Sequence, residues 1–144
     1  QLKVNVPFHV ALLACVLSCQ TLTSLSLSIS SYDVKRIMEI PKSFILPALL
    51  SLRLDHFPIS ADESGHAEPV SNCEKLRTLN INHCRVLLPD ALVGNGSEVL
   101  NITNGTLTNL TMDFTHPYKT VISALNLSSF TFNGAPFQTL HSRK

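Results

Sequence analysis

A six-residue pattern with apolar residues at its first, fourth and sixth positions occurs five times along this chain, and it constrains the fold more than any other feature. The five copies read LTSLSL, LLSLRL, LRTLNI, LTNLTM and LSSFTF, and they begin at residues 22, 49, 76, 107 and 127. The intervals between them are 27, 27, 31 and 20 residues. Small polar residues, which end strands and begin turns, follow all five copies. They are Ser28, Asp55, Asn82, Asp113 and Asn133.

This LxxLxL pattern places its last two apolar residues two positions apart, on one face of a β-strand. A unit of this length cannot bury its apolar side alone, so successive units stack and share one core. Periods of 20–29 residues built on this pattern are typical of leucine-rich repeats. We therefore expect residues 1–144 to form a single α/β repeat domain, a solenoid with short parallel strands on its concave face. The expected strands lie near 22–28, 49–55, 76–82, 107–113 and 127–133.

The segments between the copies form the convex side, which we expect to be irregular or to contain short helices. Apolar residues recur at helical spacing over 33–40, and Pro41 ends the predicted helix. The stretch 57–72 combines prolines, a glycine and three acidic residues with few large apolar ones, which predicts an exposed irregular loop. Residues 86–93 predict a buried stretch broken by a proline. Residues 99–102 predict an additional strand, which accounts for the 31-residue interval.

Residues between the leucines point away from the shared core and form a mostly uncharged polar surface. Such a surface suits binding to another macromolecule, and we expect a protein partner on this concave face. The expected partner-binding residues are Ser26, Arg53, Asp55, Arg77, Asn80, Asn82, Thr111, Asp113 and Thr131.

The charge balance argues against partners that are bound through charge alone. The chain carries 11 Lys and Arg against 10 Asp and Glu, a formal net charge of +1 at pH 7. That balance gives no field that would steer the chain onto nucleic acid or an acidic membrane. The apolar run at 10–17 is shorter than the roughly 20 residues that a membrane span needs. We expect this run to form a buried helix or a loop leading into a strand.

The cysteines and histidines do not form a recognisable metal or catalytic pattern. The four cysteines lie at positions 15, 19, 73 and 84, with no CxxC pair among them, so we expect reduced and buried thiols rather than a zinc site. Cys84 falls where the longer leucine-rich repeat pattern places an Asn or Cys, and we expect it to pack in the core. His83 and Cys84 are adjacent, so on a strand they point to opposite faces and cannot form a catalytic pair. We predict no enzyme activity, metal or cofactor.

Several longer segments resemble a known family. These segments are 19–25 (CQTLTSL), 40–43 (IPKS), 46–55 (LPALLSLRLD), 67–79 (AEPVSNCEKLRTL) and 125–137 (LNLSSFTFNGAPF). Across roughly residues 15–137 the chain resembles the leucine-rich repeat region of plant F-box proteins, including the F-box/FBD/LRR group. In that family an F-box segment binds a Skp-type adaptor of a cullin ubiquitin ligase, and the repeats select the protein substrate. The resemblance implies substrate selection in the cytoplasm or nucleus.

The chain departs from that family because it contains neither an F-box segment nor an FBD module. We therefore interpret it as a fragment or truncated member of a longer protein. Adaptor binding cannot be assigned to any residue present, and no catalytic residue comes with the resemblance, since the repeat region only binds.

Five N-x-S/T sequons in the second half of the chain support an alternative. They begin at Asn95, Asn101, Asn104, Asn109 and Asn126. The number exceeds the chance expectation and favours a secreted or cell-surface repeat ectodomain that binds a peptide, protein or glycan. Against this, Asn109 lies inside a predicted strand, and Asn and Ser/Thr are abundant at the exposed strand positions. We expect these sequons not to be glycosylated.

Overall fold

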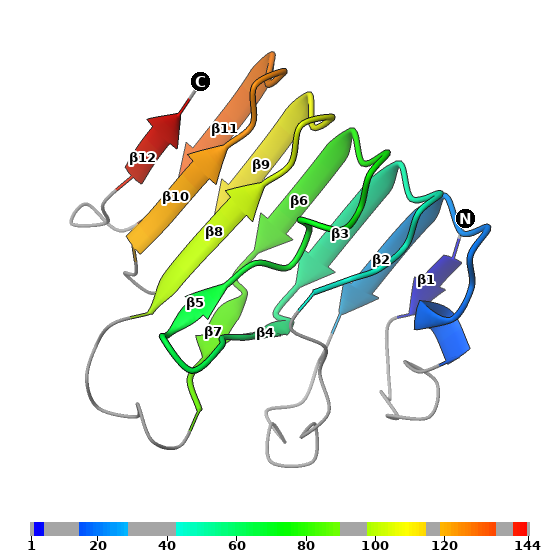
Figure 1. The fold of residues 1–144 in the computed structure, drawn as a ribbon, viewed down its shortest axis with the longest axis horizontal. Coiled ribbons are helices and arrows are strands. Elements are labelled where there is room, and N and C mark those ends of the chain that lie inside the picture. The colour runs from blue at the N-terminus through cyan, green and yellow to red at the C-terminus, as the bar shows by residue number, and fades with distance from the viewer. Residues whose placement is uncertain are drawn as a thin grey trace.

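Twelve short β-strands make up about half of the described part of the chain. The computed structural model describes residues 2–4, 15–28, 43–89, 98–114, 119–134 and 140–143, with the backbone alone described for the first and last of these ranges. The strands form three sheets, and the paired strands are parallel throughout (Figure 1). Helical residues within these ranges are confined to 15–17.

The largest sheet has six strands, and five of them lie within the LxxLxL segments. In spatial order its strands are β1 (Leu2–Val4), β2 (Ser24–Ser28), β3 (Ser51–Asp55), β6 (Thr78–Asn82), β9 (Asn109–Asp113) and β11 (Ser129–Asn133). The register aligns equivalent positions of the pattern, so that Leu52 lies opposite both Leu25 and Leu79. The parallel-strand part of the predicted fold is therefore confirmed. Strand β1 has no LxxLxL segment and was not predicted.

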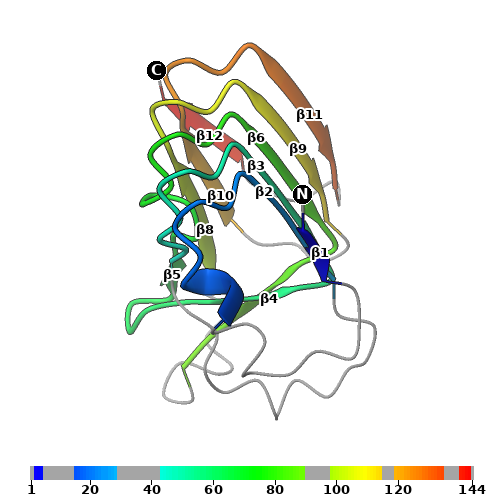
Figure 2. The ribbon, with the colours of Figure 1, turned by 90° about the vertical axis from the view of Figure 1, so that its right-hand side faces the viewer.

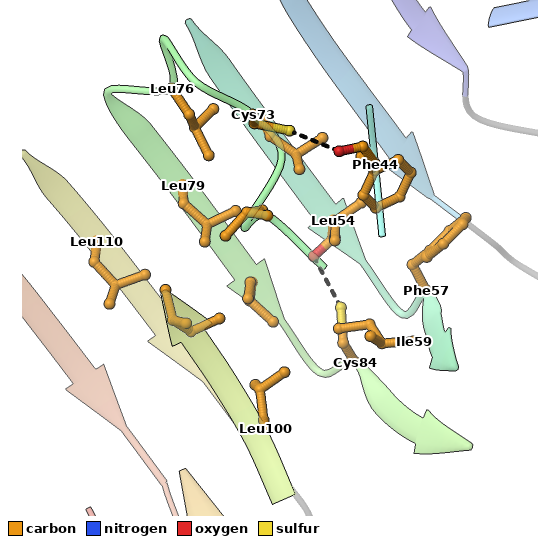
Figure 3. Close-up of a cluster of buried hydrophobic side chains, with 14 of the residues drawn as sticks. Phe44, Leu54, Phe57, Ile59, Cys73, Leu76, Leu79, Cys84, Leu100 and Leu110 are labelled. Carbon is orange, nitrogen blue, oxygen red and sulfur yellow. Dashed lines mark hydrogen bonds between the residues drawn. The ribbon is translucent and has the colours of Figure 1, made fainter. Parts of the chain in front are cut away.

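The strand alternation separates a buried face from a solvent face. Equivalent leucines of four successive strands, Leu25, Leu52, Leu79 and Leu110, are 0–1% exposed. Burying one such side chain stabilises the fold by about 1.5–3 kcal/mol. Figure 3 shows Leu79 and Leu110 in a cluster of buried side chains that also includes Phe44 from a connecting segment.

A second sheet of four strands packs on the other side of this core. Its strands are β5 (His66–Ala67), β8 (Val99–Thr103), β10 (Lys119–Ser123) and β12 (Leu140–Arg143), in the order β12-β10-β8-β5. From β8 onward the chain alternates between the two large sheets, and Figure 2 shows the sheets facing each other. Leu100, Ile102 and Ile122 of this sheet are buried. The expectation of an irregular or helical convex side is therefore wrong for residues 66–67, 119–123 and 140–143, which form parallel strands instead.

The stretch 57–72 is also not the exposed loop that its composition predicts. It contains β4 (Pro58–Ser60), which pairs with β7 (Arg85–Leu87), and the two-residue strand β5. Phe57, Ile59 and Val70 are 0–1% exposed. The prediction treated the prolines as a sign of a loop, but a proline can begin a strand at the edge of a sheet, as Pro58 does in β4.

The other predictions for the connecting segments have mixed outcomes. The additional strand expected at 99–102 is confirmed as β8. The predicted helix at 33–40 lies outside the described residues. Of the apolar run at 10–17, residues 15–17 are helical and Val16 is buried. Of the stretch 86–93, Val86 and Leu87 end β7 and are half-buried, and residues beyond 89 are not described.

The turn that leads into each strand of the LxxLxL segments is closed by a hydrogen bond from the first leucine to the residue three positions earlier. In four copies the N–H of the first leucine donates to the carbonyl three residues earlier, at 3.2–3.4 Å. The pairs are Leu22–Cys19, Leu49–Leu46, Leu76–Cys73 and Leu127–Ala124. In the remaining copy Leu107 N–H donates instead to the side-chain Oδ1 of Asn104, at 3.1 Å.

Candidate functional site

The solvent face of the six-stranded sheet carries continuous rows of polar residues. Because the strands are in register, each position of the pattern forms one row across the sheet, with about 4.8 Å between neighbouring members. The central row is Ser26, Arg53, Asn80, Thr111 and Thr131. The row nearer the strand ends is Ser28, Asp55, Asn82, Asp113 and Asn133. We call these two rows together the polar face.

Eight of the nine predicted partner-binding residues lie on the polar face. Five form the central row, and Asp55, Asn82 and Asp113 belong to the second row. Arg77 does not lie with them, because it precedes β6 and sits in the turn that leads into that strand.

An ionic hydrogen-bond network joins two strands of the polar face. Arg53 Nε donates to Asp55 Oδ2 at 2.8 Å, and Asn82 Nδ2 donates to Asp55 Oδ1 from the neighbouring strand, also at 2.8 Å. Burial raises the pKa of Asp55, but the hydrogen bonds from Arg53 and Asn82 outweigh burial and hold this pKa below its ordinary value. The Arg53 side chain remains 55% exposed. The Arg53 guanidinium would therefore be accessible to a partner while already paired with the Asp55 carboxylate.

Two histidines extend the polar face at the ends of β3 and β6. The rings of His56 and His83 stack with centroids 5.2 Å apart, and Nε2 of His83 lies 3.8 Å from Asp113 Oδ2. Both residues have a positive φ, 53° and 51°, which is uncommon for a residue other than glycine. The contact between His56 and His83 was not predicted, because His83 was considered only beside Cys84. The available signal was their spacing, since they lie 27 residues apart, one repeat period.

A groove lies where the strands of the six-stranded sheet begin. Its volume is about 480 Å³, and three of its lining residues, Leu50, Arg77 and Thr108, hold the second position of the LxxLxL pattern. Their backbone carbonyls also form a ladder, because each accepts hydrogen bonds from two N–H groups of the next copy. Glu74, Lys75, Thr106 and Asn126 complete the lining. The groove thus combines two cations, one carboxylate and an exposed leucine beside the polar face.

The four cysteines are free thiols, but only two are buried as expected. Cys84 Sγ donates to Leu54 O at 3.2 Å, and Cys73 Sγ donates to Phe44 O at 3.3 Å. Burial raises the pKa of both thiols, that of Cys84 to about 12. Cys15 and Cys19 are exposed, which corrects the prediction for the first pair. No group of three metal-ligating side chains occurs among the described residues.

The sequon asparagines occupy very different environments. Asn104 is 5% exposed, and its Nδ2 donates to the carbonyls of Val70 and Cys73. An amide in this position is not accessible to a modifying enzyme in the folded chain. Asn109 and Asn126 are exposed, Asn101 is half-buried on β8, and Asn95 lies outside the described residues.

Comparison with protein-family models, with curated proteins and with solved structures finds no match to this chain. Across the described ranges, no helix combines the length and apolar character that a bilayer span requires.

Proposed function

We propose that this chain is a leucine-rich repeat solenoid that serves as a non-enzymatic protein-recognition module, with the polar face as its binding surface. One observation carries the proposal: the LxxLxL segments form neighbouring parallel strands in register, so their intervening residues line up in rows on one solvent face. The repeated turn, with its hydrogen bond to the third residue before each first leucine, supports the repeat interpretation.

The size and chemistry of the polar face favour a polypeptide partner over a small metabolite. Five strands about 4.8 Å apart and five residues long span roughly 19 Å by 17 Å. The rows present hydroxyl, amide and carboxylate groups, with Arg53 as the central cation. Small-molecule sites are instead pockets or clefts that enclose most of the ligand and are lined mostly by apolar side chains. A partner would be recognised through shape and hydrogen bonds, since the chain carries little net charge.

By its resemblance to plant F-box proteins, the role we propose is substrate selection for a Skp–cullin–F-box ubiquitin ligase in the cytoplasm or nucleus. Adaptor binding would then depend on an F-box supplied outside these residues. The free thiols and the inaccessible Asn104 amide are consistent with a reducing compartment. The alternative, a secreted or cell-surface ectodomain, is favoured by the exposed sequon asparagines Asn109 and Asn126.

The test is a pair of matched threonine-to-lysine substitutions. Thr111→Lys introduces a bulky charge at the centre of the polar face, and Thr103→Lys makes the same change on the four-stranded sheet. A partner captured by the immobilised chain is purified, and its dissociation constant is measured with each variant. We expect Thr111→Lys to weaken binding at least tenfold and Thr103→Lys to leave it unchanged. Equal affinity for both variants would place the binding site elsewhere.

A second pair of variants separates the polar face from the groove. Arg53→Glu alters the central row of the polar face, whereas Arg77→Glu alters the groove that lies beside the polar face. If the polar face is the primary surface, Arg53→Glu weakens binding more than Arg77→Glu does.

The ubiquitin ligase role needs its own experiment. The chain is fused behind an F-box segment and reconstituted with the Skp adaptor, the cullin and the captured partner. Ubiquitin transfer to the partner with the native fusion, and its loss with the Thr111→Lys fusion, is the expected result. Binding without transfer would reject the ligase role and retain the recognition function.

A further inference from the structure

The groove at the start of the six-stranded sheet is built from the turns of four successive LxxLxL copies. Figure 1 shows these turns side by side, ahead of β3, β6, β9 and β11. The lining runs from Leu50 in the second copy, past Lys75 and Arg77 at the third, to Thr108 in the fourth and Asn126 just before the fifth. Four copies cover three strand spacings, or roughly 14 Å, which is the length of about four extended residues.

The two cations of the groove are not neutralised by an acidic side chain of the described ranges. Lys75 and Arg77 lie on either side of the buried Leu76, and both are exposed. Among the described residues neither of them forms an ion pair, although Glu74 also lines the groove. Arg53 on the polar face differs, because it is already paired with Asp55. With two cations against one carboxylate, the groove attracts an anionic group.

The uncharged polar side chains of the groove present acceptors. The hydroxyl of Thr106 donates to Leu76 O at 2.8 Å, and the hydroxyl of Thr108 donates to Arg77 O at 3.1 Å. A hydroxyl has one hydrogen, so both oxygens keep lone pairs with which to accept further hydrogen bonds. The charged donors of the groove therefore come from Lys75 and Arg77, and the hydroxyl oxygens suit the backbone N–H groups of a polypeptide.

Leu50 adds an apolar contact to this charged site. Its side chain is 41% exposed, whereas the same position is held by Thr23 and Arg77 in the neighbouring copies. An apolar side chain of a ligand would remove Leu50 from water. The described residues that line the groove include no aromatic side chain, and Glu74 would repel a phosphate backbone. Single-stranded nucleic acid is therefore disfavoured, since it is bound through aromatic stacking and continuous positive charge.

We propose that this groove binds an extended acidic segment of a polypeptide, with a carboxylate held by Lys75 and Arg77 and a neighbouring apolar side chain against Leu50. Backbone N–H groups of the segment donate to the hydroxyl oxygens of Thr106 and Thr108. The proposal rests on the proposed function in taking a polypeptide as the partner, but it gives the groove a ligand chemistry of its own. Because the groove lies beside the polar face, one partner chain can occupy both surfaces.

The test uses matched peptides and the whole 144-residue chain. The probe is acetylated and amidated Gly-Ser-Leu-Glu-Leu-Ser-Gly, and the control peptide carries Gln in place of Glu. Titration of the isotope-labelled chain, followed by NMR, measures the dissociation constants and locates the site. We expect the Glu peptide to shift the amide signals of Lys75, Arg77 and Thr108. It should bind roughly fivefold more tightly than the Gln peptide, and added salt should reduce this difference.

Three variants test the residues assigned to the groove. Arg77→Glu should weaken binding of the Glu peptide roughly tenfold and remove its advantage over the Gln peptide. Arg85→Glu makes the same charge change at an exposed position of β7, away from the groove, and should leave binding unchanged. Leu50→Ser should weaken both peptides roughly threefold, because it removes the apolar contact. The amide spectrum of each variant shows whether it is folded.

Equal affinity of the native chain for the two peptides, or no signal shift at about 1 mM peptide, would overturn the proposal. Equal weakening by Arg77→Glu and Arg85→Glu would do the same. Tighter binding of an oligothymidine at the same amides would assign the groove to nucleic acid and also overturn it. Shifts confined to the polar face, for example at Thr111, would reject the groove site while supporting the proposed function. The two proposals can therefore fail separately.

Discussion

The side-chain amide of Asn104 donates a 2.9 Å hydrogen bond to the backbone carbonyl of Cys73, the residue that holds the same place in the preceding repeat. Both residues lie three positions before the first leucine of an LxxLxL segment. The same amide donates to Val70 O, while Oδ1 of Asn104 accepts from the N–H groups of Thr106 and Leu107. One asparagine therefore connects the turns of two successive repeats.

Replacing Asn104 by alanine should destabilise the fold by about 3 kcal/mol, because buried carbonyl and N–H groups lose their partners. Urea unfolding followed by circular dichroism measures the change. Asn109→Ala is the matched control, since Asn109 is exposed and its amide donates to the hydroxyl of the neighbouring Thr108. The control should lie within about 0.5 kcal/mol of the native chain. Equal effects from both substitutions would contradict the role given to Asn104.

The row of buried leucines that contains Leu79 predicts a second large loss of stability. Leu79→Ala should lower the free energy of unfolding by about 3 kcal/mol, since Leu79 is fully buried near the centre of the sheet. Leu125→Ala removes the same atoms from a side chain that is 69% exposed. This substitution should change the free energy of unfolding by less than about 1 kcal/mol. Both are measured by urea unfolding at low protein concentration. A mild effect at Leu79 would mean that the two sheets do not share a tightly packed core.

Acid should destabilise the chain partly through Asp62. Its Oδ1 accepts hydrogen bonds from Ser64 N–H, Ser64 Oγ and His66 N–H, and these bonds lower the pKa of Asp62 below its ordinary value. A lowered pKa in the folded state means that this stabilisation is present above about pH 4 and is lost as the pH falls through the folded pKa. Asp62→Asn should therefore reduce the loss of stability between pH 6 and pH 3.

Denaturant unfolding at the two pH values measures this effect. Glu63→Gln removes the adjacent exposed carboxylate and should preserve the native pH response. If Asp62→Asn and Glu63→Gln respond to acid alike, the hydrogen-bonded turn at Asp62 has no role in acid stability.

The LxxLxL pattern was sufficient to predict five of the six strands of the six-stranded sheet, because its apolar alternation and its spacing along the chain are independent indications of a strand; β1 has no such segment and was not predicted. The four-stranded sheet lacked such a signal, since β5 has only two residues and the strands on that side share no motif. Arg77 was assigned to the polar face because the pattern does not mark where the turn ends and the strand begins. The contact between His56 and His83 depends on the register of two strands, which the individual segments do not specify.

The two pairs of cysteines should differ sharply in reactivity. Thiolate is the reactive form, and the Cys84 thiol is buried with its pKa raised to about 12, while burial also raises the pKa of Cys73. Cys15 and Cys19 are exposed. Iodoacetamide at pH 8 should therefore modify two thiols in the native chain and all four in denaturant, with mass spectrometry identifying the sites. Rapid native-state modification of Cys84 would show that the core between β3 and β6 opens far more readily than its burial implies.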